Sequence, residues 1–161
     1  MFTVLRNTWA LFFGFGIICL AHGLQGTLIG VRSVLEGFSY LSTGLIIAGY
    51  YVGYLSGSII IPIFLKRVGH IRVFAALASL ASIAILIHSV FLDPYSWFVI
   101  RIFTGLSLSG IYIIMESWLN DKSNNQTRGQ ILSIYMIITF IFVGLGQLLL
   151  NLSDPAKVDL F

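Results

Sequence analysis

The sequence contains few charged residues and very few acids. Only 9% of its 161 residues are Asp, Glu, Lys or Arg, whereas a soluble domain has roughly a quarter. Because 58% of the residues are hydrophobic and the mean hydropathy is +0.97, water could not solvate the surface of a folded soluble domain. We therefore predict an integral membrane protein. The net charge of +3 is then no sign of nucleic-acid binding, since the cations lie at the ends of apolar runs.

Cysteine occurs once, at Cys19, which excludes an intrachain disulfide and a thiolate metal site. Its apolar neighbours predict a small packing residue. The sequence has no zinc-ligand spacing, no GxSxG, no phosphate-binding glycine loop and no paired carboxylates. We therefore predict no enzyme, no cofactor and no metal, and an intramembrane enzyme remains a weak alternative.

Five apolar runs are long enough to cross a hydrocarbon core, which takes about 20 residues. Each must be helical, because lipid offers no partner to an unpaired backbone group. The predicted fold is all-α, with five transmembrane helices at about 7–31, 42–65, 73–92, 94–119 and 129–150. Residues 1–21 could be read as a signal peptide, but apolar character continues beyond them and no small-x-small cleavage site is present.

Cations at the ends of the runs predict the orientation. With a cytoplasmic N-terminus, six cations lie inside and two outside, as the positive-inside rule requires. The inside set is Arg6, Lys66, Arg67, Arg72, Lys122 and Arg128, and the outside set is Arg32 and Lys157.

Local residues also indicate helix ends. Asp93-Pro94 predicts a helix start, and a polar turn follows the fourth run. The odd number of spans leads us to expect the front part of a larger protein.

A glycine stripe and a basic loop follow one another in the second run. Gly49, Gly53 and Gly57 recur every four residues and therefore share one helix face, which allows close approach of another helix. After Pro62, we expect a basic loop at 66–72 that joins two spans as a cytoplasmic hairpin.

The fourth run contains two charges, Arg101 and Glu116, which are about 22 Å apart along a helix. They share a face with Gly105 and Tyr112, and such a face normally borders a protein interior or an aqueous cavity. We favour a pathway role for Arg101, with snorkelling to the surface as the alternative. Glu116 is either a coupling carboxylate or an interfacial structural one.

The first run carries a second polar stripe. His22, Gln25, Arg32 and Glu36 follow one helical face, and the first two lie near the depth expected for Arg101. A hydrogen-bonded cluster between the first and fourth helices is therefore a hypothesis. His22 could serve as a proton site or as a structural hydrogen-bonding residue.

The region around the basic loop resembles the major facilitator superfamily of permeases. That family's loop signature is, in outline, Gly-x-x-x-Asp-Arg-x-Gly-Arg-Lys. Arg67 and Gly69 match it, whereas Pro62 replaces the first glycine, Lys66 the aspartate and His70 the next arginine. The replaced aspartate helps to stabilise one gating state in the family.

The fourth run resembles the family more closely. Arg101 and Gly105 fall where the family has its arginine and glycine, and Ser107 is small where glycine is common. The stretch 116–120, with Arg128-Gly129, resembles a poorly characterised bacterial branch. The glycines of the fifth run are not closed by Gly-Pro, so the antiporter signature is absent.

The resemblance implies five of the six helices of the N-terminal half of a twelve-helix transporter. Such a transporter moves a small organic solute by alternating access around a central site lined by helices one and four. Proton coupling and a bacterial inner-membrane location rest on the resemblance alone. The implied partners are the lipid bilayer, the solute, protons and the remaining helices.

The predicted site residues form three groups. The pathway group is His22, Gln25, Arg101, Tyr112 and Glu116; the gating-loop group is Lys66, Arg67, Gly69, His70 and Arg72; the helix-packing group is Gly49, Gly53, Gly57 and Gly105. The alternative function is a small membrane subunit that transports nothing and uses its glycine face to pack against a partner protein.

Overall fold

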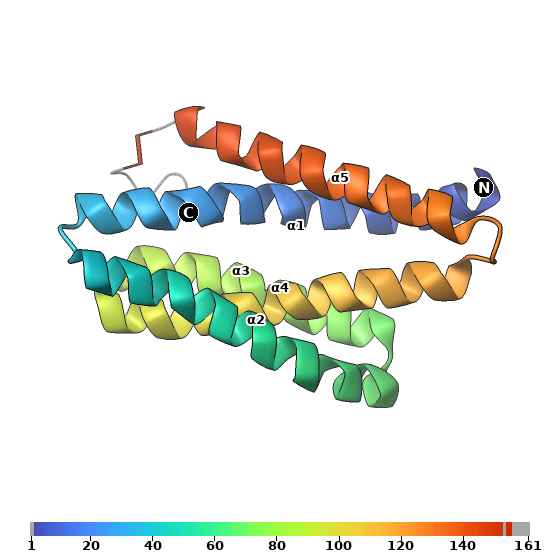
Figure 1. Ribbon diagram of the computed structural model, residues 1–161, viewed down its shortest axis with the longest axis horizontal. Helices are drawn as coiled ribbons and strands as arrows, with labels where there is room; N and C mark the ends of the chain where they lie inside the picture. The colour runs from blue at the N-terminus through green and yellow to red at the C-terminus, as the bar shows by residue number, and fades with distance from the viewer. Residues whose placement is uncertain (1, 153, 156–161) are drawn as a thin grey trace. The chain divides into compact units, whose positions relative to one another are not determined.

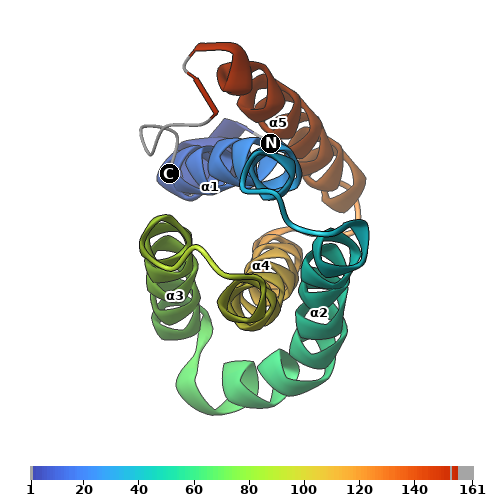
Figure 2. The same cartoon turned by 90° about the vertical axis from the view of Figure 1, so that its left-hand side faces the viewer.

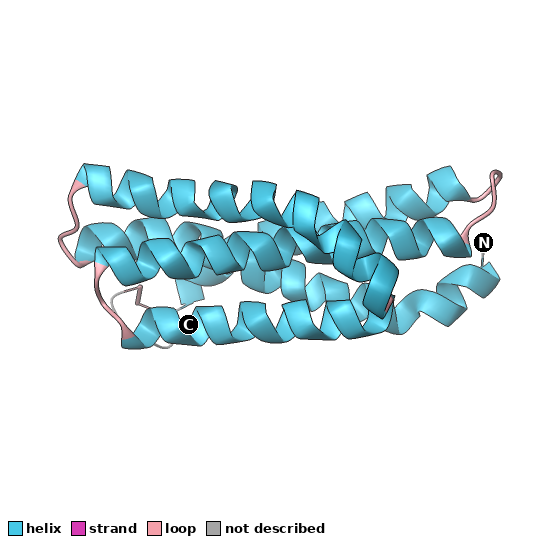
Figure 3. Cartoon of the chain, turned by 90° about the horizontal axis from the view of Figure 1, so that it is seen from below, coloured by secondary structure: helices cyan, strands magenta, loops and turns pink. Residues whose placement is uncertain are grey.

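The computed structural model describes residues 2–152 and 154–155, with side chains from Trp9 onward. It contains five long α-helices and a final 3-10 turn, and no strand among the described residues (Figures 1 and 3). The elements are α1 (Phe2–Leu35), α2 (Tyr40–Val68), α3 (His70–Val90), α4 (Pro94–Lys122), α5 (Arg128–Leu149) and η1 (Leu150–Leu152). All five α-helices are long and apolar enough to span a membrane, which confirms the predicted fold class. Lys157, one of the two cations predicted outside, lies beyond the described residues.

The first helix ends four residues later than predicted, because a local motif terminates it. Gly37 has a φ of +73°, a conformation that glycine adopts without steric cost. The amide of Phe38 donates to the Ser33 carbonyl and the amide of Gly37 to the Val34 carbonyl, both at 3.0 Å. These two bonds form a Schellman motif, which satisfies carbonyls at the helix end.

The predicted seven-residue basic loop at 66–72 is wrong. The helix α2 continues through Pro62 to Val68, and α3 begins at His70, so Gly69 alone separates them. Lys66 and Arg67 extend the helix because cations in the last turn interact favourably with the helix dipole. The chain reverses at Gly69, whose φ is +89° and whose amide donates to the Leu65 carbonyl.

The chain forms two compact units. The first consists of Met1–Ile29 and Glu116–Leu160, and it contains most of α1, the last turns of α4, and α5. The second consists of Gly30–Met115, and it contains α2, α3 and most of α4.

In the first unit, α1 and α5 lie side by side (Figures 1 and 2). Two glycines lie at their contact. A Cβ at Gly23 would overlap the Val143 backbone, and a Cβ at Gly146 would overlap the Leu20 backbone. Each glycine therefore lets one helix backbone touch the other. Cys19 is 1% exposed in the same unit, as its apolar surroundings predicted.

In the second unit, α4 lies between α2 and α3 (Figure 2). The glycine stripe of α2 faces α4: a Cβ at Gly53 would overlap the Ile102 carbonyl, and those at Gly49 and Gly57 would lie within 3 Å of α4 carbonyls. From the other side, a Cβ at Gly105 would overlap the Tyr50 carbonyl. The two helices are thus held backbone to backbone.

At the start of α4, a local cap and a buried indole hold the helix in place. Asp93 accepts hydrogen bonds from the amides of Tyr95 and Ser96, both at 3.0 Å, as the Asp-Pro pair predicted. Trp97 is fully buried and packs edge-on against Phe38 and His88.

Candidate functional site

The strongest candidate site lies at Arg101, which comes seven residues after Pro94, the first residue of α4. Its side chain belongs to the second unit and is 5% exposed. The guanidinium carbon lies 4.7 Å from the centre of the Tyr50 ring, a cation–π contact. Nε and Nη1 of Arg101 have no hydrogen-bond partner among the described residues. A buried cation with unused donors is costly to keep, and in a membrane helix it normally marks a function.

The contact between Arg101 and Tyr50 follows from the glycine packing. Gly105 stands one helical turn after Arg101, and its missing side chain admits the backbone of Tyr50. Since α2 and α4 touch at this level, the Tyr50 ring reaches the guanidinium without spanning a gap. The site is therefore built by two close-packed helices rather than by a flexible loop.

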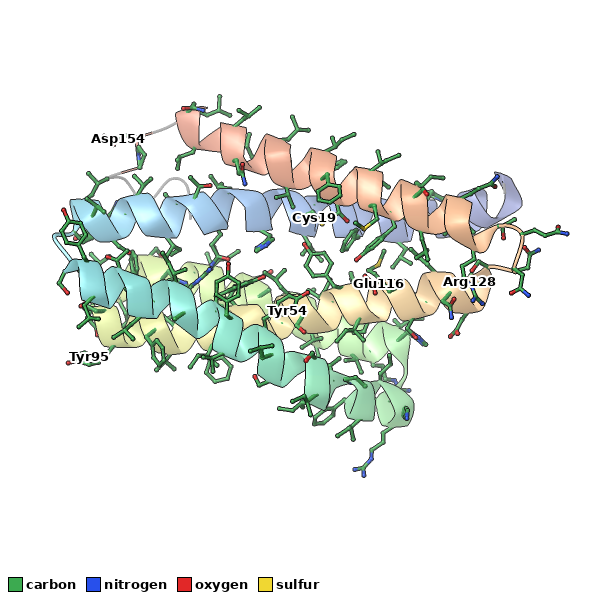
Figure 4. The ribbon with its side chains drawn as sticks, in the orientation of Figure 1. Cys19, Tyr54, Tyr95, Glu116, Arg128 and Asp154 are labelled. Atoms are coloured by element: carbon green, nitrogen blue, oxygen red, sulfur yellow. The ribbon has the colours of Figure 1, made fainter. Side chains whose placement is uncertain are left out.

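Two more tyrosines of α2 continue the aromatic group at Tyr50. The ring of Tyr51 lies 5.4 Å from that of Tyr50, and the ring of Tyr54 lies 5.9 Å from it. Figure 4 labels Tyr54 on α2. Our sequence reasoning missed Tyr50. The available signal was its place between Gly49 and Gly53, on a helix whose glycine face was already predicted to meet a neighbour.

His88 is a second buried polar residue of this unit. It is fully buried, and its Nδ1 lies 2.7 Å from the Ala84 carbonyl. The Trp97 ring centre lies 5.5 Å away. These contacts give His88 a packing role on α3.

In the first unit, Glu116 of α4 accepts a hydrogen bond from the Tyr135 hydroxyl of α5 at 3.2 Å. The Tyr135 ring is also stacked on Phe15 of α1, with ring centres 5.2 Å apart. Figure 4 labels Glu116 at this place on α4. A hollow of about 510 Å³ is lined here by Glu116, Ser117, Asn120, Leu132, Tyr135 and Met136.

The other residues predicted for the pathway are divided between the two units. His22 and Gln25 lie on α1 in the first unit, with Gln25 3% exposed, and Tyr112 lies half-buried on α4 in the second. A cluster between the first and fourth helices would join the two units and stays a prediction. Arg32 and Glu36 of the same predicted stripe form an ion pair at 2.6 Å.

The residues predicted for gating surround Gly69, at the tight connection between α2 and α3. The side chains of Lys66, Arg67 and Arg72 are exposed, and His70 is half-buried. They present cations at one end of these two helices.

Five helices of membrane-spanning length, two of them with a buried arginine, define a multi-pass integral membrane protein. The chain belongs to the Major Facilitator Superfamily, whose family model matches residues 11–152. It is 25% identical over 151 residues to proteins named "Uncharacterized MFS-type transporter YcaD" from Escherichia coli O45:K1 (strain S88 / ExPEC) and Escherichia coli O81 (strain ED1a). The alignment covers 94% of this chain and 40% of each relative. No solved structure matches the chain significantly.

Proposed function

We propose that this chain is the N-terminal part of a secondary active transporter that moves a small organic solute by alternating access. Membership of the family and the printed name of the relatives, an MFS-type transporter, support transport rather than catalysis. The chain spans 40% of the length of these relatives, so we propose that helices in the remaining length complete the solute path.

One observation supports this proposal above the others: the buried Arg101 guanidinium against Tyr50 in a membrane-spanning helix. At the centre of a membrane helix a charge costs about 2.5–3.5 kcal/mol or more, and nearer the helix end it is still unfavourable. The Tyr50 ring offsets part of this cost, but an apolar residue would pack there without it, so we propose that the charge serves the transport cycle.

The alternative of a non-transporting subunit has less support from the structure. It requires the glycine face of α2 to be available for a partner protein. Gly49, Gly53 and Gly57 are all buried, and each faces α4 of the same chain. That face is already occupied.

Two further features fit alternating access. The bond between Glu116 and Tyr135 joins α4 to α5 through a carboxylate. The exposed cations around Gly69 fit a cytoplasmic end under the positive-inside rule, with a cytoplasmic N-terminus in the inner membrane. We propose both as parts of the transport cycle.

Substitution of Arg101 in the full-length protein tests the function. A panel of radiolabelled sugars, amino acids, carboxylates and amines is first screened for uptake into proteoliposomes. Arg101→Ala is expected to abolish uptake of any solute found while leaving membrane insertion unchanged. Lys122→Ala is the matched control, because it removes an exposed cation from the last turn of the same helix. Normal uptake by Arg101→Ala contradicts the proposed site.

A further inference from the structure

We infer that the joined ends of α2 and α3 bind the headgroup of an anionic membrane phospholipid through Lys66, Arg67 and Arg72. The inference goes beyond the proposed transport function, because such a lipid binds whether or not a solute moves. It follows from three observations on the second unit: the placement of these three cations, the positions of its carboxylates, and the exposed apolar side chains beside the cations.

The three cations lie at the membrane surface because the two helices are joined without a loop. Only Gly69 separates α2 from α3. Lys66 and Arg67 therefore stand in the last turn of α2 and Arg72 in the first turn of α3, and all three side chains are exposed. The 29 residues of α2 are about 43 Å long, more than the roughly 30 Å of a hydrocarbon core. Because cations are unfavourable in hydrocarbon, the excess length places this end in the headgroup layer.

The carboxylates of the second unit lie at the opposite ends of these helices. Within Gly30–Met115 there are two, Glu36 and Asp93. Glu36 precedes the start of α2 and forms an ion pair with Arg32 at 2.6 Å. Asp93 follows the end of α3 and caps α4. The joined ends of α2 and α3 therefore carry three positive charges that no carboxylate of the same unit neutralises.

Exposed apolar side chains beside the cations indicate a lipid rather than a free phosphate ion. Phe64 is 52% exposed and stands three residues before Arg67, so the two are neighbours on the surface of α2. Ile71, which precedes Arg72, is 68% exposed. A phospholipid offers acyl chains to these apolar side chains and a phosphate to the cations. A free phosphate would contact the cations alone and leave the apolar side chains uncovered.

The charge of the three side chains selects the headgroup. Arg67 and Arg72 can each form paired hydrogen bonds with phosphate oxygens, and Lys66 adds a compact positive charge. Each such cation near a membrane surface favours an anionic lipid by about fivefold in affinity. A zwitterionic headgroup also contains a phosphate, but its ammonium group is repelled by the same cations. A headgroup with a net negative charge therefore fits this end best.

Photocrosslinking of the full-length protein tests the inference in vesicles of equal parts phosphatidylglycerol, which is anionic, and phosphatidylcholine, which is zwitterionic. The crosslinker is introduced as Ile71→benzoylphenylalanine, and the captured lipid is identified by mass spectrometry. Phosphatidylglycerol is expected to be enriched there about fivefold or more. Ile83→benzoylphenylalanine is the control, because Ile83 is 52% exposed in the middle of α3 and should capture the two lipids equally.

Charge substitutions then identify the cations responsible. Lys66→Gln with Arg67→Gln is expected to reduce the enrichment at residue 71 by about fivefold for each cation removed. Lys122→Gln with Arg128→Gln removes the same charge from other exposed helix ends and should leave it unchanged. Exchanging the two cations, as Lys66→Arg with Arg67→Lys, keeps the charge and should keep the enrichment, which controls for folding.

The inference is overturned if the crosslinker at residue 71 captures both lipids equally, if removal of the two cations changes nothing, or if the control pair has the same effect. Capture at residue 83 without any capture at residue 71 would also overturn it, because protein would then cover this end. An excess of glycerol 1-phosphate should leave the enrichment intact, since it has no acyl chains. Loss of the enrichment would assign the cations to a free phosphate and refute the lipid site.

Discussion

Gly53 of α2 lies so close to the Ile102 carbonyl of α4 that no side chain fits between the two backbones. Gly105 of α4 makes the reciprocal approach to the Tyr50 carbonyl. Gly53 belongs to α2 and Gly105 to α4. At this level, each helix backbone therefore fits into the space that a side chain of the other helix would fill. This crossing sets the position of the Tyr50 ring against Arg101. The packing of two glycines is therefore a condition for the charged site.

Gly53→Ala is expected to destabilise the protein by about 1–3 kcal/mol, the usual cost of overpacking. The new methyl group meets a backbone carbonyl, which cannot move aside as a flexible side chain could. Gly44→Ala is the control on the same helix, because a Cβ at Gly44 meets nothing within 4 Å. It should leave stability unchanged or raise it slightly, since alanine favours helix. Thermal unfolding of the two variants in detergent measures the difference, and equal Tm values would show that the contact is looser than described.

The contact between α1 and α5 gives an independent prediction in the first unit. Gly146→Ala places a methyl group against the Leu20 backbone and should lower stability by a similar amount, about 1–3 kcal/mol. Gly144→Ala, two residues earlier on α5, meets nothing within 4 Å and should have little effect. Denaturation in mixed micelles compares the two. A larger loss in Gly144→Ala than in Gly146→Ala would contradict the assigned face of α5.

The bond between Tyr135 and Glu116 predicts energetic coupling between α4 and α5. Tyr135→Phe removes the donor at 3.2 Å but keeps a ring to stack on Phe15. A double-mutant cycle with Glu116→Ala should give a coupling energy of about 0.5–1.5 kcal/mol, the net value of a hydrogen bond. The four proteins are compared by equilibrium unfolding. Additive effects of the two substitutions would show that the bond contributes nothing.

The Asp93 cap predicts a loss of stability in acid. Hydrogen bonds from Ser96, together with the amide of Tyr95, lower the pKa of Asp93 from its ordinary 3.8. A carboxyl whose pKa is lower in the folded protein stabilises it above the unfolded pKa, and this contribution is lost as pH falls through the folded pKa. Asp93→Asn keeps the cap without a titrating group. Its Tm should therefore fall less between pH 5 and pH 3 than that of the unaltered protein, and parallel curves would refute the effect.

Much of the local structure was readable from the residues. The cap at Asp93 was predicted because an N-cap needs only the residues next to it. Cys19 was expected to be buried because its own run is apolar. The basic loop is the wrong prediction: the cations from Lys66 onward indicate a loop after a helix that ends at residue 65, but α2 continues to Val68. The end of a helix depends on where the chain can turn, and here only Gly69 has the required φ.

The sequence by itself determined the five apolar helices, because span length and hydropathy decide whether a segment is helical in lipid, whatever its neighbours are. It also placed Arg101 and Glu116 within a helix. Only the tertiary structure decided their partners, Tyr50 for Arg101 and Tyr135 for Glu116. The physical reason is that a partner depends on the rotation and register of two helices. Those are set by close packing between residues about 20 to 50 positions apart, such as Gly53 and Ile102, and no local pattern encodes them.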